Sequence, residues 1–89
     1  MYTRLKYSFE LVDLDDSQIA IPVGNRSDEF HGIIKLNETA AFILSLLKEE
    51  ITEEQIVSAL FKEYSISLET LKEDVHSYLS KFRERGILV

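Results

Sequence analysis

The chain has 89 residues, a formal net charge of −6, and 45% hydrophobic and 29% charged residues. This length allows one domain over residues 1–89, and the composition is typical of a globular protein rather than a disordered one. The acidic balance disfavours binding to a phosphate backbone, so we expect no nucleic-acid partner. The absence of cysteine excludes disulfides and thiolate chemistry. Because no signal peptide or bilayer-spanning run is recognised, we expect a cytoplasmic protein without a membrane partner.

The first third of the chain predicts short β-strands. Residues 9–12 form the first candidate, and residues 18–23 alternate as a half-buried strand does. Pro22 lacks an N–H donor, so it belongs at a strand end, at an edge or in a bulge. After a polar loop at residues 24–29, a third strand is predicted over about residues 32–36.

The remainder of the chain predicts three helices. The first covers about residues 38–48. The second begins with Thr52 followed three residues later by Gln55, which is the pattern of a capping box. Ser67 is placed to cap the third helix, and Gly86 is typical of the position just past a helix end.

The order of these elements predicts an α+β fold of three short antiparallel strands followed by three helices. The second and third helices are joined by a short turn at residues 64–67 and resemble a helix-turn-helix. A small sheet beside them gives the winged version, so the expected fold is winged helix-turn-helix-like.

Four segments carry a resemblance to a known family. They are Gly32-Ile33-Ile34-Lys35-Leu36-Asn37-Glu38-Thr39-Ala40-Ala41, Thr52-Glu53-Glu54-Gln55, Asp74-Val75 and Gly86-Ile87-Leu88. They resemble the PqqD-like family, named after the pyrroloquinoline quinone biosynthesis protein D, over about residues 9–88. The most specific part is the strand–helix junction at residues 36–40, where Asn37 is a good N-cap.

The resemblance implies a recognition element for ribosomally made, modified peptides. In that family the leader segment of a precursor peptide adds as a strand to the third strand and lies against the third helix. A modifying enzyme, often a radical SAM enzyme, then acts on the same peptide. The domain itself is a non-catalytic chaperone or adaptor without a cofactor, and this chain resembles the stand-alone form.

An exposed strand edge offers unpaired N–H and C=O groups that a guest peptide satisfies, and side-chain pockets then supply specificity. Here the pocket is expected between the third strand and the apolar stripe of the third helix. The plainer interpretation is that the same side chains are only core, and a groove floor can be both. The candidate peptide-binding residues are Gly32, Ile33, Ile34, Lys35, Leu36, Lys72, Val75, His76, Leu79, Phe82 and Arg83.

Three of these candidates form one flank of the third helix. At 100° per residue, Lys72, His76 and Arg83 fall together beside the apolar stripe. Lys35 extends this patch if the strand and the helix are adjacent. The flank suits an acidic peptide, or it is a solvated face with snorkelling side chains. If it binds the peptide, reversing the charges of Lys72 and Arg83 weakens the binding of an acidic leader and reduces its salt dependence.

Other functions find less support in the sequence. His31 and His76 lie in different elements without a recognisable metal-ligand spacing, and no catalytic or phosphate-binding motif is present. A winged helix DNA-binding regulator is the alternative function, but the basic and acidic side chains along the third helix balance. A homodimer, formed by pairing of the exposed strand with its own copy, stays open as a further partner.

Overall fold

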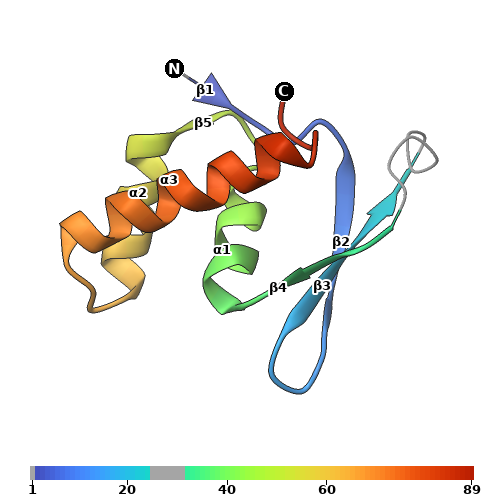
Figure 1. Ribbon diagram of the computed structural model, residues 1–89, viewed down its shortest axis with the longest axis horizontal. Coiled ribbons are helices and arrows are strands. Elements are labelled where there is room, and N and C mark those ends of the chain that lie inside the picture. The colour runs from blue at the N-terminus through green and yellow to red at the C-terminus, as the bar shows by residue number, and fades with distance from the viewer. Residues whose placement is uncertain (1, 25–31) are drawn as a thin grey trace.

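The computed structural model describes residues 2–24 and 32–89 and contains a sheet, a short ribbon and three helices (Figure 1). The strands are β1 (Tyr2–Thr3), β2 (Ser8–Asp13), β3 (Gln18–Val23), β4 (Ile34–Leu36) and β5 (Ile51–Thr52). The helices are α1 (Glu38–Leu46), α2 (Glu53–Glu63) and α3 (Leu68–Glu84). The predicted α+β class is confirmed, with its three-stranded antiparallel sheet and three helices. The two-residue strands β1 and β5 were not predicted.

The main sheet has the order β2-β3-β4, so β3 lies in the middle. Strand β2 pairs with the whole of β3, whereas β4 pairs only with residues 18–20 of it. Pro22 therefore lies beyond the reach of β4, opposite Phe9 of β2. A proline is tolerated there because its missing N–H leaves no gap in the β3–β4 ladder.

Strand β4 is shorter than the sequence predicts. It begins at Ile34, so Gly32 and Ile33 are outside the strand, and the expectation of a strand from residue 32 is wrong. The reason is local: Gly32 has a φ of +103°, which extended L-residues do not adopt. His31 and most of the predicted polar loop lie outside the described residues.

Each helix begins directly after the residue that the sequence predicts as its cap. The Asn37 side chain accepts a hydrogen bond from the Ala40 N–H at 2.8 Å, and Thr52 and Gln55 form both bonds of the capping box. Ser67 accepts a longer bond of 3.3 Å at the start of α3. Such caps satisfy N–H groups that have no partner within the helix.

The end of α3 turns the chain back onto the core. The Gly86 N–H donates to the Arg83 carbonyl at 2.9 Å and the Ile87 N–H to the Phe82 carbonyl at 3.2 Å, which together form a Schellman motif. Gly86 adopts the positive φ of +72° that this motif requires. As a result Ile87 is fully buried, and Leu88 forms a β-bridge with Leu5.

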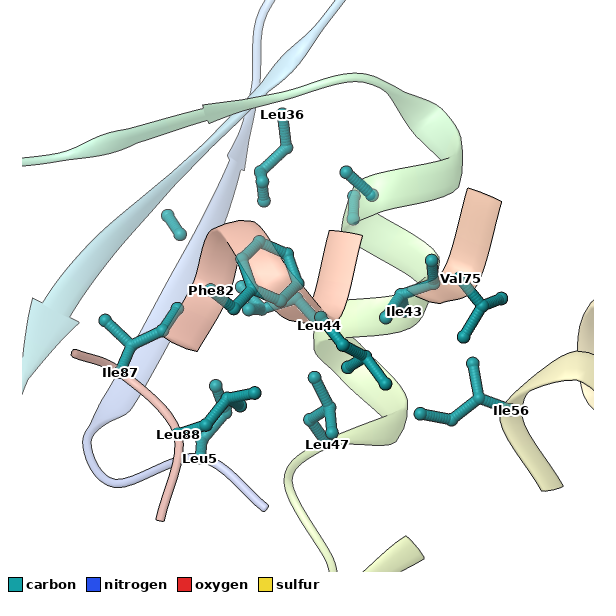
Figure 2. Packing of buried hydrophobic residues seen from close by; sticks show 14 of the residues in the cluster. Leu5, Leu36, Ile43, Leu44, Leu47, Ile56, Val75, Phe82, Ile87 and Leu88 are labelled. Carbon is teal, nitrogen blue, oxygen red and sulfur yellow. The ribbon is translucent and has the colours of Figure 1, made fainter. Parts of the chain in front are cut away.

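Helix α1 lies at the centre of the hydrophobic core (Figure 2). Its Ile43 and the following Leu47 are 0% exposed. Figure 2 shows Val75 of α3 beside Ile43 and Ile56, and Phe82 on the side toward the sheet. The sheet contributes the inward side chains of β4 together with Phe9 and Ala20. This core fixes α3 against both α1 and the sheet.

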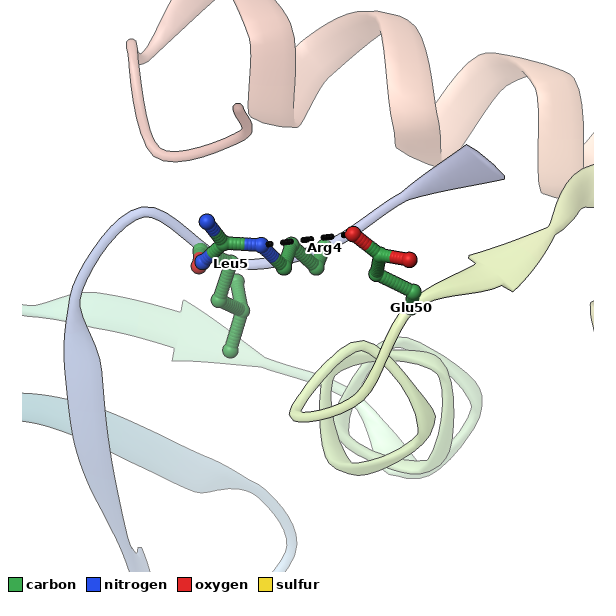
Figure 3. Close-up of polar contacts among 3 residues, drawn as sticks. All are labelled: Arg4, Leu5 and Glu50. Carbon is green, nitrogen blue, oxygen red and sulfur yellow. Dashed lines mark hydrogen bonds and ion pairs between the residues drawn. The ribbon is translucent and has the colours of Figure 1, made fainter. Parts of the chain in front are cut away.

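The N-terminal segment is held mainly by backbone hydrogen bonds. Strand β1 pairs with β5, the Leu5 N–H donates to the Leu47 carbonyl at 2.9 Å, and the Lys6 N–H donates to the Ile87 carbonyl at 2.7 Å. Arg4 also reaches Glu50 at 4.0 Å, as Figure 3 shows. Both of these side chains are exposed, so that ion pair adds little stability. Within the described ranges, none of the helices combines the length and the apolar character that crossing a bilayer requires.

Candidate functional site

Strand β4 has an open edge. It is the last strand of its sheet and pairs with β3 on one side only. Among the described residues, no backbone hydrogen bond joins Ile34, Lys35 or Leu36 to an element on the other side. Because alternate residues of a strand direct their N–H and C=O groups to opposite neighbours, part of the β4 backbone is available for pairing.

A groove of about 230 Å³ lies between β4 and the C-terminal half of α3. Its volume is below the 300–1,000 Å³ usual for small-molecule sites, so it suits one or two side chains of a larger partner. The groove is lined by Ile34, Lys35, Leu36, Asn37, Ala40, Tyr78, Lys81, Phe82 and Arg85.

The two walls of the groove match in length. Tyr78, Lys81, Phe82 and Arg85 follow the i, i+3, i+4, i+7 pattern of one helix face, which spans about 10 Å at 1.5 Å per residue. The three residues of β4 span about 10 Å at 3.3 Å per residue. A short extended segment can therefore contact the strand edge and the helix along its whole paired length.

Asn37 and Tyr78 join the two walls at one end of the groove. The Asn37 side-chain N–H donates to the Tyr78 hydroxyl at 2.8 Å, and the hydroxyl lies 3.2 Å from Asn37 Oδ1. The same Oδ1 caps α1 by accepting from the Ala40 N–H. One side chain thus links the end of β4, the start of α1 and the middle of α3, and so sets the spacing between strand and helix.

We expect Asn37→Ala to lower the free energy of unfolding by about 1–2 kcal/mol, because it removes the α1 cap and the bond to Tyr78. Tyr78→Phe removes only the bond, and we expect about 0.5–1.5 kcal/mol. Urea denaturation of the two single variants and the double variant measures their coupling. Strictly additive losses in the free energy of unfolding would contradict the proposed link between Asn37 and Tyr78. Asn37→Asp, which keeps the oxygen that caps α1, is the matched control.

Cations from both walls border the groove. Lys35 is exposed on β4, Lys81 lies on α3, and Arg85 is the C-cap of α3. The Lys81 ammonium lies 5.8 Å from the centre of the Tyr78 ring, within the range of a cation–π contact. No Asp or Glu occurs among the described residues that line this groove. Its lining is therefore locally positive in a chain whose net charge is −6.

The structure places the predicted site residues in four groups, of which the cationic flank of α3 is described last. Ile34, Lys35, Leu36 and Phe82 line the groove, as the sequence predicts. Val75 and Leu79 do not line it, and both are 0% exposed within the hydrophobic core, although Leu79 lines the separate hollow beside Lys72 and Arg83. A role of these two residues in peptide binding stays a prediction. Gly32 and Ile33 precede β4 and do not line the groove either, and Ile33 is 54% exposed.

The predicted cationic flank lies on another side of α3. Lys72 and Arg83 line a separate hollow of about 560 Å³, which is formed with β1, β5 and α2. His76 Nδ1 lies 3.4 Å from Glu53 Oε2 at the start of α2. The structure therefore does not join this flank to Lys35 in one patch, and that expectation is corrected. The flank meets carboxylates of the chain's own second helix.

Sequence reasoning missed five lining residues. They are Asn37, Ala40, Tyr78, Lys81 and Arg85, none of which is among the candidate peptide-binding residues that the sequence predicts. One signal could have found the helical ones, because Tyr78, Lys81 and Arg85 lie four, one and three residues from the predicted Phe82. Among the described residues, no three His, Asp or Glu side chains gather in a way that could hold a metal ion.

Comparison with known proteins agrees with this architecture. TbiB1 in complex with the TbiA(beta) leader peptide is similar to the chain with a TM-score of 0.73 and 22% identity, over 96% of this chain and 93% of that one. Lasso peptide synthetase B1 complexed with the leader peptide is similar with a TM-score of 0.72 and 18% identity, over 98% and 96% of the two chains. No curated protein matches the sequence. The family model of coenzyme PQQ synthesis protein D (PqqD) matches residues 11–88, and the chain therefore belongs to the PqqD family.

Proposed function

We propose that the chain is a non-catalytic adaptor that captures the leader segment of a ribosomally made precursor peptide and presents it to a modifying enzyme. The observation that carries this proposal is the open β4 edge beside the groove at α3. A peptide that adds to this edge satisfies the β4 backbone and lays alternate side chains toward Phe82. Two structures that share the fold are complexes with leader peptides, which supports the proposal.

The modifying enzyme is the partner that performs the chemistry in this proposal, and a radical SAM enzyme is the class that the family resemblance favours. The adaptor needs only to hold the leader, since the peptide's core segment can then reach the enzyme. A cytoplasmic location fits such an encounter between a newly made peptide and its enzyme. Pairing of β4 with a second copy of itself would compete with the leader for the same edge.

We expect a leader peptide to shift the amide resonances of β4 and of residues 78–85 when it is titrated into ¹⁵N-labelled protein. The reason is that new hydrogen bonds form on the open edge and side chains enter the groove. A scrambled leader is the control. Shifts confined to β2, which is the other edge of the sheet, or to the hollow at Lys72 would contradict the proposed site.

DNA binding is the alternative that the fold suggests, and it is not favoured. The described residues of α3 carry Lys72, Lys81 and Arg83 against four carboxylates, which is a poor balance for a helix that enters a phosphate-lined groove. A gel-shift titration with duplex DNA at low salt distinguishes the two functions, and the adaptor proposal expects no retarded band.

A further inference from the structure

We propose that the segment captured at β4 is an acidic strand, in which the apolar side chains that enter the groove alternate with carboxylates. This inference rests on the proposed function and names the class of peptide. Its basis is the charge of the groove, which is opposite in sign to the net charge of the chain. The groove is bordered by Lys35, Lys81 and Arg85, and none of the described residues that line it is acidic. The whole chain has 16 acidic and 10 basic residues, so this concentration of cations opposes the overall balance.

The positions of these cations indicate where the carboxylates of the captured segment are expected to lie. A guest strand beside β4 alternates its side chains in the same way as β4 itself. Guest side chains that point inward lie beside the buried Ile34 and Leu36 and contact Phe82. Guest side chains that point outward lie beside the exposed Lys35. Apolar–acid–apolar is therefore the pattern that complements the three residues of this edge.

The helix side of the groove reinforces the same pattern. The Lys81 ammonium lies over the Tyr78 ring, and Arg85, the C-cap of α3, lines the groove about one helical turn further along the chain. Rim charges act mainly on the encounter rate and on the rejection of wrong partners. A basic segment of equal hydrophobicity would meet the like charges of Lys35 and Lys81 at this groove, and we expect it to be rejected.

The size of the groove limits the recognised segment. A volume of about 230 Å³ accommodates one or two apolar side chains. The three residues of β4 pair with about three or four residues of a guest strand. The site is therefore expected to recognise a short element within a leader. Apart from the apolar contact, charge is the main determinant of its specificity.

The test uses three labelled synthetic peptides that differ only in charge. Each carries leucine at alternate positions, and the intervening positions are glutamate, glutamine or lysine. We expect the glutamate peptide to bind at least about tenfold more tightly than the glutamine peptide, and the lysine peptide not to bind, by fluorescence anisotropy. We also expect the affinity for the glutamate peptide to fall as NaCl is raised.

Two double variants locate the effect. Lys35→Glu with Lys81→Glu is expected to weaken binding of the glutamate peptide at least about tenfold and to flatten its salt dependence. Lys48→Glu with Lys62→Glu makes the same change in net charge at exposed positions outside the groove and is the matched control. We expect the control to bind within about twofold of the unaltered protein. Circular dichroism verifies that both variants are folded.

The outcomes separate this inference from the function on which it rests. Equal binding of the glutamate and glutamine peptides, or equal losses in the two double variants, would overturn the acidic preference. If both peptides still shift the β4 amides, strand capture itself stands. If a leader shifts the β4 amides but the glutamate peptide does not, only the acidic preference fails. If neither the leader nor any of the synthetic peptides shifts the β4 amides, the proposed function fails as well. A loss only on reversal of Lys72 and Arg83 would place the site at the other hollow.

Discussion

Replacing Leu79 with alanine is expected to lower the free energy of unfolding by about 2–5 kcal/mol. The side chain is 0% exposed within the core that joins α3 to α1, so its loss leaves a cavity. For a chain of this size the change corresponds to a fall in Tm of roughly 8–40 °C. Thermal denaturation followed by circular dichroism measures it.

Two further variants make this expectation specific. Phe61→Ala removes a larger side chain that is 53% exposed, and we expect a change within about 0.5 kcal/mol. Leu79→Met conserves volume and should cost less than about 1.5 kcal/mol, which keeps a folded protein for binding studies. If Leu79→Ala left Tm unchanged but abolished peptide binding, Leu79 would belong to the binding site and not to the core.

Backbone methylation of a bound leader peptide is expected to divide its residues into two sets. In a strand added to β4, every second N–H points to β4 and the others point to solvent. N-methylation of the first set removes donors to an edge carbonyl and should weaken binding about 10–100-fold. Methylation of the second set should change the affinity within about threefold. Isothermal titration calorimetry with the two methylated peptides compares them.

The pattern of this result distinguishes strand addition from other binding modes. A peptide held only by side chains in the groove would respond to the two methylations alike, since neither set of N–H groups would have a partner on β4. Equal losses in both peptides would therefore contradict strand addition. The same experiment assigns the register, because the sensitive residues are those paired with the open edge.

The helix starts could be predicted from the sequence because their causes are local. Thr52 and Gln55 satisfy each other's backbone groups within one turn, and Ser67 needs only the Thr70 N–H. The Schellman end at Gly86 likewise depends on residues within a few positions of one another. Such short-range arrangements are the same in any fold that contains the helix.

Apart from the start of β4, which the local conformation of Gly32 decides, the errors arose where distant segments decide the structure. Strands β1 and β5 have two residues each and exist because Tyr2 and Thr3 meet residues almost fifty positions later. The periodicity of α3 identified a buried stripe but could not tell which border of that stripe faces β4. Lys72 and Arg83 lie on one border and Lys81 and Arg85 on the other, and the packing of α3 against α2 and β1 decides between them.

The bridge between Leu5 and Leu88 has a consequence for tethering. It holds the first and last described segments side by side, and neither segment lines the groove between β4 and α3 (Figure 1). We therefore expect that a second protein attached by a flexible linker at either end would leave the open edge of β4 uncovered. Fusion to a fluorescent reporter or to a catalytic partner at one end is interchangeable with fusion at the other, since both attachment points lie beside the same bridge.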